Sequence, residues 1–184
     1  TRPIFSYRNY YQKIRLEYPK NWVVGNLKSF ILPMESTKID TDYFNYIDID
    51  AIDNKNNEII NPKHISKKNA PSRASRKLHS GDVLFSLVRP YLKNIAIIKQ
   101  EFSDYVASTG FYVCTPMSFL NSEYLFYFLI SPYCINRVMH FMKGNNSPSI
   151  RGCTLESLYI GIPNYNEQKR IVNKIKNLYN LIIN

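Results

Sequence analysis

The fold of this chain is organised around Pro71-Ser-Arg-Ala-Ser-Arg-Lys-Leu-His-Ser-Gly-Asp-Val-Leu-Phe-Ser-Leu-Val-Arg-Pro-Tyr91. Residues 83–88 form a short run of apolar and β-branched side chains, which predicts a buried strand. Residues 80–82 predict a turn before it, and Pro90 cannot donate a backbone hydrogen bond, so the strand should end at Arg89. Two cationic loops should therefore lie at the two ends of one rigid strand.

Cationic and hydroxyl side chains flank this strand. Such a mixture offers a phosphate backbone both ionic and neutral hydrogen-bond donors. We therefore predict that residues on both sides of the strand bind DNA. They are Ser72, Arg73, Ser75, Arg76, Lys77, Arg89, Tyr91 and Lys93.

The net charge of +10 over 184 residues is the strongest feature of the composition. That much uncompensated positive charge on a small protein usually indicates a polyanionic partner. The distribution agrees, because no acidic residue lies between Glu58 and Asp82, or from Tyr124 to Leu155. A basic surface can also be a solvated face without a binding role. Two such spans beside a hydroxyl-rich loop favour nucleic acid.

Length and composition predict one compact domain with an appendage. Hydrophobic residues make up 45% of the chain and aromatic residues 14%, which suits a packed core. No apolar run approaches the ~20 residues that cross a bilayer, and no signal-peptide pattern begins the chain, so we expect a cytoplasmic protein without a membrane partner. Cys114, Cys134 and Cys153 form no disulfide or metal-site pattern, and we expect them to be reduced and mostly buried.

Acidic residues alternate with apolar ones in Tyr46–Ile52, which predicts a half-buried strand. Asp48, Asp50 and Asp53, in and just after this strand, raise the alternative of a metal-dependent nuclease. Their spacing does not follow an EF-hand calcium loop, which needs Gly at its sixth position and Glu at its twelfth. We therefore expect no metal site, and magnesium-dependent cleavage stays an alternative to be tested.

Two further strands are predicted at residues 95–98 and 105–114. Gly110 lies within the second, where a glycine marks either a bulge or a close backbone approach. The neighbouring hydroxyl residues Ser108 and Thr109 are therefore candidates to face a ligand. Small residues that fill a strand bend would explain them equally well.

Helices are predicted at residues 124–130, after the capping sequence Asn121-Ser122-Glu123, and at 132–143, after the N-cap Ser131. Gly144 should end the second helix. The loop that follows is rich in amide and hydroxyl groups, and Asn and Arg side chains pair with adenine and guanine edges. It could also be an ordinary turn, because Asn, Ser and Pro form turns. The candidate base readers are Asn145, Asn146, Ser149 and Arg151.

A last strand is predicted at residues 158–162, and a helix follows, with Asn164 as N-cap and Glu167 in the capping-box position. Four apolar residues along this helix have the spacing of a coiled-coil stripe. Such a stripe packs within its own domain or against a partner, and its terminal place favours a partner. These helix-pairing residues are Ile171, Ile175, Leu178 and Ile182. We thus expect a lead-in segment (1–20), a recognition domain (21–163) and a helix (164–184).

Several catalytic patterns are absent from the sequence. It contains no GxxxxGKS, GxxxxGKT or GxGxxG motif, so no nucleotide cofactor is expected. The three histidines have no partnered Cys or Ser, so no nucleophilic constellation is visible. The chain therefore looks like a reader of nucleic acid rather than an enzyme. A structural RNA-binding protein is a further alternative.

Several segments, taken in order, resemble a known family. They are residues 81–90 (GDVLFSLVRP), 107–111 (ASTGF), the paired helices, 161–163 (GIP) and 167–172 (EQKRIV). This set is similar to the target recognition domain of type I restriction-modification DNA specificity subunits, over about residues 22–181. The resemblance implies an α+β fold: a mixed, mostly antiparallel β domain with packed helices, followed by a coiled-coil-type C-terminal helix that pairs with another such helix.

The resemblance also implies a subunit that is not itself catalytic. Each recognition domain of such a subunit reads one half of a bipartite site in double-stranded DNA. The subunit docks modification (methyltransferase) subunits and a restriction subunit. Family members usually carry two recognition domains, whereas this chain has one and no internal repeat. We therefore expect either that two copies pair through their helices or that the chain is a fragment of a longer subunit.

Overall fold

The computed structural model describes residues 17–183, and of residues 182 and 183 only the backbone. The predicted lead-in segment therefore lies mostly outside the described residues. The strands are β1 (Val23–Asn26), β2 (Ile31–Leu32), β3 (Tyr43–Ile47), β4 (Ile52–Asp53), β5 (Glu58–Ile59), β6 (Lys63–Ser66), β7 (Ala74–Lys77), β8 (Val83–Ser86), β9 (Ile95–Ile97), β10 (Val106–Ser108), β11 (Phe111–Pro116) and β12 (Tyr159–Ile162). The helices are α1 (Ser122–Ile130), α2 (Pro132–Met139), α3 (Gly152–Glu156) and α4 (Tyr165–Ile183).

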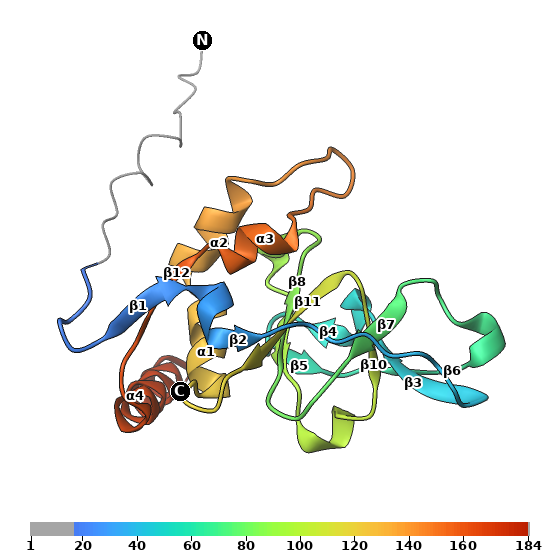
Figure 1. Cartoon of the computed structure of the whole chain (residues 1–184), viewed down its shortest axis with the longest axis horizontal. Helices are drawn as coiled ribbons and strands as arrows, with labels where there is room; N and C mark the ends of the chain where they lie inside the picture. Colours follow the sequence, from blue (N-terminus) through green and yellow to red (C-terminus); the bar gives the residue numbers. More distant parts are fainter. Residues whose placement is uncertain (1–16, 184) are drawn as a thin grey trace, which may run out of the picture.

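Two four-stranded sheets and a group of helices build the molecule (Figure 1). The central sheet has the order β2-β11-β8-β9 and its pairs are antiparallel. The outer sheet has the order β6-β3-β10-β7, in which β3 and β10 run parallel and the other pairs antiparallel. The helices cover one face of the central sheet, and the outer sheet packs beyond the other. The predicted α+β class is confirmed.

Side chains of the central sheet alternate between two cores, as the two-residue period of a strand requires. Val83 and Phe85 of β8 face the core beneath the helices, whereas Leu84 faces the outer sheet. On β11, Tyr112 likewise faces the core beneath the helices, and Phe111 faces the outer sheet. Because both faces of the sheet are covered, its inner strands are almost entirely apolar.

Strand β8 ends at Ser86 rather than at the predicted Arg89. Leu87 and Val88 leave the sheet because they pair with the loop after α2. The N–H of Ile150 donates to the carbonyl of Leu87 (2.9 Å), and Val88 forms an antiparallel bridge with Ser149. The strand prediction was correct in place but too long.

The predicted strand over residues 46–52 is wrong. Strand β3 ends at Ile47, and a 3-10 turn over Ile49–Ala51 leads into β4. The N–H of Ala51 donates to the carbonyl of Asp48 (3.1 Å), which closes the turn. Ile47, Ala51 and Ile52 are nevertheless all buried. The alternation of apolar and acidic residues therefore correctly predicted that apolar side chains of this segment are buried, although they lie around a 3-10 turn rather than along one strand.

The predicted strand over residues 105–114 is two strands in different sheets. Strand β10 belongs to the outer sheet and β11 to the central sheet, and the chain crosses between them at Thr109-Gly110. A Cβ on Gly110 would approach Cδ1 of Ile49 at 2.9 Å, so a larger residue here would displace the end of the Ile49 side chain. Gly110 therefore marks a close approach.

Side-chain caps begin α1, α2 and α4, as predicted. The side chain of Asn121 accepts a hydrogen bond from the N–H of Tyr124 (3.0 Å), and that of Ser131 from the N–H of Cys134 (3.2 Å). Asn164 likewise accepts a hydrogen bond from the first turn of α4 (3.0 Å). Each cap satisfies a backbone donor that has no partner within the helix.

Helix α2 ends at Met139, before the predicted Lys143. Lys143 exchanges two backbone hydrogen bonds with Ser149 (both 2.9 Å), and this pairing draws the chain out of the helix. Gly144 follows with a φ of +99°, which suits a glycine. The short helix α3 was not predicted.

Helix α4 begins inside the domain. Gln168 is fully buried, and its side chain bonds to the N–H of Asn121 (2.8 Å) and to the carbonyls of Phe119 and Pro163 (both 2.9 Å). Before α4, β12 pairs with β1 in a two-stranded antiparallel ribbon. Within residues 17–183, no helix is both long and apolar enough to span a membrane.

The three cysteines are free, as expected. Cys114 and Cys134 are buried, and Cys153 is exposed on α3. Burial raises the pKa of the Cys114 and Cys134 thiols, so both are held in the neutral form. They act as core side chains.

Candidate nucleic-acid interface

A cleft of about 420 Å³ lies between the outer sheet and the loops that follow β8 and α2. Three of the predicted DNA-binding residues line it: Arg73, Arg89 and Ser108. Ser147, from the polar loop after α2, lines it as well. With residues 46 and 48–50, which also line it, the cleft gathers residues from five separate segments of the sequence.

Arg73 is held at the cleft by its backbone. It lies in a turn closed by a hydrogen bond from the N–H of Ala74 to the carbonyl of Pro71 (2.9 Å). Its own carbonyl accepts a hydrogen bond from the N–H of Thr109 (2.8 Å), at the crossing between the two sheets. The residue itself is exposed, so a fixed backbone presents a free guanidinium group to the cleft.

Arg89 is tied to the polar loop on the other side of the cleft. Its N–H donates to the carbonyl of Pro148 (2.8 Å), and its Nη2 donates to the carbonyl of Asn146 (3.0 Å). The bridge between Val88 and Ser149 continues this pairing. The loop, orange in Figure 1, is therefore joined to the extension of β8 and projects from the body of the molecule.

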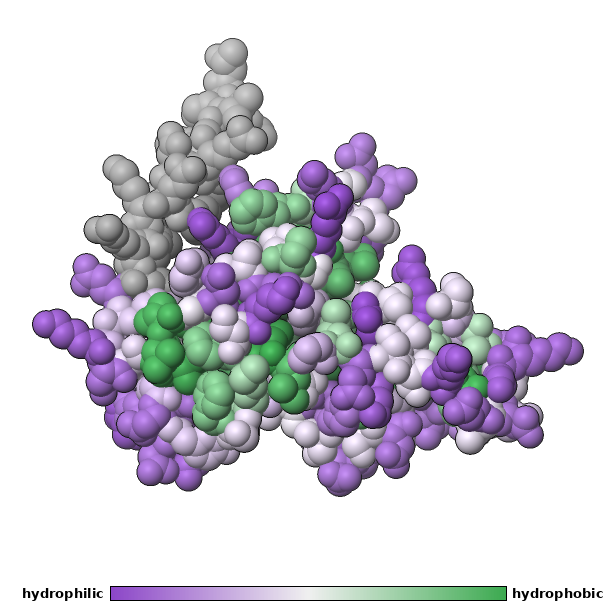
Figure 2. All heavy atoms as spheres, viewed as in Figure 1, coloured by the Kyte–Doolittle hydropathy of each residue, from purple (hydrophilic) through white to green (hydrophobic). Residues whose placement is uncertain are grey.

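The cations of the cleft have no acidic partners in the described part of the chain. The ion pairs among the described residues join other side chains, and none includes Arg73, Arg89 or Lys93. Asp48 and Asp50 also line the cleft, but Asp48 pairs with Lys63 of β6. Two guanidinium groups thus have donors available to an anion. Hydrophilic side chains are abundant over the outer sheet beside the cleft, at the right of Figure 2.

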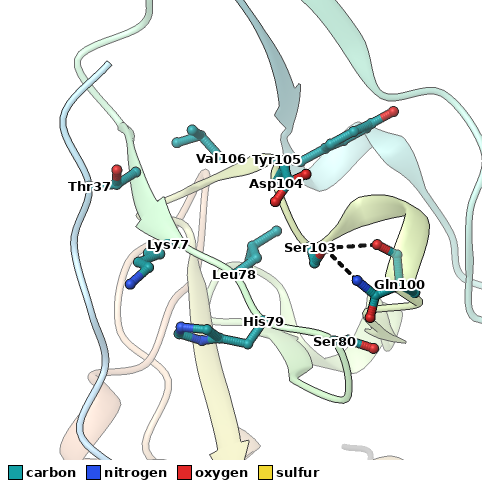
Figure 3. A pocket seen from close by; sticks show the side chains of 10 residues that line it. All are labelled: Thr37, Lys77, Leu78, His79, Ser80, Gln100, Ser103, Asp104, Tyr105 and Val106. Atoms are coloured by element: carbon teal, nitrogen blue, oxygen red, sulfur yellow. Dashed lines mark hydrogen bonds between the residues drawn. The ribbon is translucent and has the colours of Figure 1, made fainter. Parts of the chain in front are cut away.

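Lys77 faces a different cavity, of about 400 Å³ (Figure 3). Its Nζ lies 2.7 Å from a carboxylate oxygen of Glu35, and His79 lies on the same side. Gln100 and Ser103 form the opposite wall, joined by hydrogen bonds. The basic stretch therefore divides, with Arg73 at the cleft and Lys77 in an ion pair elsewhere.

The other predicted DNA-binding residues differ in exposure. Arg76 lies in β7 rather than in a loop, and its Nε is buried without a hydrogen-bond partner. Arg151 is exposed and precedes α3 as its N-cap residue. Exposed as well are Ser72, Tyr91, Lys93, Asn145 and Asn146. Half-buried are Ser75, Thr109 and Ser149.

Sequence reasoning missed two kinds of residue at the cleft. Leu92 and Ser147 line it, although neither was singled out. Asp48 and Asp50 were considered only as metal ligands. Leu92 lies between the predicted DNA-binding residues Tyr91 and Lys93. An apolar residue at that position was the signal that could have identified it.

Asp48 and Asp53 bind different partners, because Asp48 pairs with Lys63 and Asp53 bonds within its own loop. Both carboxylate oxygens of Asp53 accept hydrogen bonds, from the N–H of Lys55 (2.9 Å) and the amide of Asn56 (2.7 Å). In the described residues, no group of three or more His, Cys, Asp or Glu side chains could hold a metal ion. The geometry therefore gives a magnesium-dependent nuclease no support.

The predicted helix-pairing residues fall in two places. Ile171 and Ile175 line an apolar cavity of about 250 Å³ together with Tyr124 and Tyr127 of α1. Leu178 is 51% exposed, farther along α4. The side chain of Ile182 lies outside the described residues. The stripe thus begins against its own domain and continues onto an exposed surface.

The sequence profile of the type I restriction modification DNA specificity domain matches residues 19–184. The chain belongs to this family. The family that the sequence resembles is therefore confirmed. Among curated relatives of the specificity domain, the type I restriction enzyme HindI specificity subunit of Haemophilus influenzae is 28% identical over 140 residues, which are 72% of this chain and 30% of that subunit.

Solved structures agree in fold. The HsdS subunit of Thermoanaerobacter tengcongensis is 35% identical, with a TM-score of 0.83 over 91% of this chain and 44% of that one. A second structure, from work on complex assembly and conformational transition of the type I R-M system, is 35% identical, with a TM-score of 0.82 over the same shares. This specificity domain spans less than half the length of each of these relatives.

Proposed function

We propose that this specificity domain reads one half of a bipartite site in double-stranded DNA. One observation carries the proposal: Arg73 and Arg89 line one cleft beside a polar loop, and neither has an acidic partner among the described residues. Guanidinium groups bind phosphates and fix the register of a protein on a duplex. Amide and guanidinium side chains of the adjoining loop suit base edges in the major groove.

The residues have separate roles in this proposal. Arg73, Arg89 and Lys93 contact phosphates, which gives affinity without sequence preference. The loop after α2 supplies base contacts, and its bond to Arg89 sets its place relative to the phosphates. The candidate base readers are Asn145, Asn146, Ser149 and Arg151.

The proposal gives the domain no chemistry of its own. Modification and restriction subunits would methylate and cut the DNA to which the domain directs them. Helix α4 would pair with the corresponding helix of a second recognition domain or a second copy of the chain. Membership of the family and the exposed end of the α4 stripe support this arrangement.

The salt dependence of DNA binding tests the phosphate contacts. The logarithm of the binding constant falls with the logarithm of salt concentration, with a slope of about 0.9 for each phosphate neutralised. Arg73→Ala should lower this slope by about one and weaken binding to all duplexes alike. Arg89→Ala should lower the slope by a similar amount and also release the polar loop, because the side chain bonds to the carbonyl of Asn146. Fluorescence anisotropy with a pool of random duplexes, between about 50 and 200 mM salt, measures the slope.

Arg170→Ala is the matched control. Arg170 is an exposed arginine on α4, paired with Glu167, and its loss should leave the slope unchanged. Equal slopes for all three variants and the unsubstituted chain would remove the cleft from the proposal. Preference for structured RNA over duplex DNA at the same salt would favour the RNA-binding alternative, and cutting with added magnesium would favour the nuclease.

A further inference from the structure

Three non-glycine residues in the described part of the chain have a positive φ, and they meet at one place. They are Asn57 (φ 57°), Arg89 (φ 47°) and Lys93 (φ 55°). Arg89 and Lys93 stand at the two ends of the 3-10 turn Pro90–Leu92. The side-chain amide of Asn57 donates to the carbonyl of Lys93 (2.9 Å). We refer to residues 89–93 as the strained turn.

The left-handed conformation is costly at both ends of the strained turn. In this conformation Cβ lies close to the following carbonyl oxygen, which costs free energy in every residue except glycine. Asn tolerates the conformation better than Arg or Lys does. Arg89 also precedes Pro90, and a residue in that place favours extended backbone. Asn57 lies in the hairpin loop between β4 and β5, where an asparagine commonly adopts this conformation. The strain therefore lies at Arg89 and Lys93.

The surrounding structure imposes this conformation from both sides. On one side, Arg89 donates its N–H to Pro148 (2.8 Å) in the polar loop. On the other, the carbonyl of Lys93 accepts hydrogen bonds from the amide of Asn57 and from the N–H of Ile95 (2.8 Å). Pro90 is buried beneath the turn. Strained backbone that its neighbours hold so firmly is a mark of a functional site.

The strained turn presents two large side chains to solvent. Tyr91 is 41% exposed and Leu92 is 39% exposed, and Leu92 lines the cleft. Arg89 and Lys93 flank them and are both exposed. A surface that combines apolar and aromatic groups with cations that lack acidic partners suits a duplex at a base step that has been opened, where base faces become accessible between the phosphates.

We propose that the strained turn is a wedge that inserts at a base step of the recognised DNA, with Tyr91 and Leu92 against the opened base faces. The inference rests on the proposed function. The two flanking cations hold the adjacent phosphates while the side chains unstack the step. Such insertion favours steps that open easily, such as TA and CA, so it adds sequence preference without hydrogen bonds to bases.

Permanganate reactivity tests the wedge, because this reagent attacks thymines that have lost stacking. The probe is a set of duplexes recovered from a random pool by binding to the 184-residue chain. In the complex, thymines at one step should become hyperreactive. Leu92→Ala and Tyr91→Ala should abolish this reactivity and weaken binding to the recovered duplexes by roughly 5- to 100-fold. Binding to random duplexes at low salt should change less than about threefold, because it depends on charge.

Leu32→Ala is the control, since Leu32 of β2 is 46% exposed and lies outside the cleft lining. It should leave both reactivity and affinity unchanged. Failure of the unsubstituted chain to bind any duplex would overturn the proposed function itself. Binding without a reactive thymine, or equal reactivity in all the variants, would overturn the wedge alone. If Tyr91 and Leu92 instead bind a protein subunit, their substitution will leave DNA binding and reactivity intact, which equally overturns it.

Discussion

Asp82 ends the turn that precedes β8, and only 1% of its surface is exposed. Its Oδ2 accepts a hydrogen bond from the backbone N–H of His79 (2.7 Å) and lies 3.5 Å from Nδ1 of the same histidine. Burial raises the pKa of the Asp82 carboxyl, and the hydrogen bonds from the side chain of Thr115 and from the N–H of His79 only partly oppose this rise. A charged carboxylate at this place therefore costs free energy in the folded state.

We expect Asp82→Asn to stabilise the protein near neutral pH. The amide oxygen still accepts the His79 N–H, and the buried charge is gone. Because the pKa of Asp82 is raised in the folded state, the cost of its charge is fully present above that pKa and disappears as the pH falls through it. The gain in the free energy of unfolding should therefore be larger at pH 7.5 than at pH 5, measured by urea unfolding.

Asp104→Asn serves as the comparison for this experiment, because Asp104 is an exposed carboxylate at the cavity that His79 also lines. It should change stability by less than about 0.5 kcal/mol at both pH values. A gain for Asp82→Asn that does not depend on pH, or a loss at pH 7.5, would contradict the assigned cost of its charge.

The chemistry of single residues indicated which side chains could bind DNA. It did not predict which of them lie together in the folded protein. Arg73 and Lys77 belong to one basic stretch, yet the first faces the cleft and the second pairs with Glu35. Arg89 reaches the polar loop through a bond to Pro148, far along the chain. Such partners come from tertiary structure, and no local pattern encodes them.

At the scale of elements, local signals predicted starts better than ends. Asn121, Ser131 and Asn164 were identified as caps because a capping side chain bonds within its own first turn. The ends of β8 and α2 were placed too late. Both are set by the same long-range pairing, of residues 87–89 and 143 with residues 148–150, which propensity cannot detect.

Gln168 belongs to the EQKRIV segment that resembles the family, and its buried hydrogen bonds give that residue a structural role. They also lead to a prediction for stability. Gln168→Leu would fit an apolar site but would leave the N–H of Asn121 and the carbonyls of Phe119 and Pro163 without these hydrogen bonds. We expect the free energy of unfolding to fall by about 2–4 kcal/mol, because unpaired buried polar groups are costly. Urea unfolding measures the change.

The control is Gln100→Leu, at an exposed glutamine in the 3-10 turn after β9. It should alter stability by less than about 0.5 kcal/mol. A loss below about 1 kcal/mol for Gln168→Leu would show that α4 is attached mainly by its apolar residues, such as the buried Val172.

At the scale of the whole molecule, α4 packs beside α1 and keeps an exposed apolar side. Leu178 and Leu181 are exposed, and Tyr179 stacks on Tyr127 of α1 (ring centroids 6.4 Å apart). When no other such helix is present, we expect two copies of the chain to pair through this surface. Sedimentation of the 184-residue chain should show an average mass that rises with concentration.

Leu178→Asp should weaken this association at least tenfold, because burying an unpaired carboxylate in an apolar contact is strongly unfavourable. Leu32→Asp, at a similarly exposed leucine of β2, should leave the association unchanged. A chain that stays monomeric at all concentrations, or equal association in both variants, would mean that α4 does not pair with itself.

The ribbon of β1 and β12 has a consequence for how such molecules diversify. Val23 lies opposite Ile162, so the polypeptide leaves the ribbon, builds both sheets and the cleft, and returns to where it started. A body whose two junctions are neighbours can be transplanted as a cassette. Provided that Asn121, the N-cap of α1, keeps its bond to Gln168, a new target preference could be grafted in one exchange while α4 stays as it was.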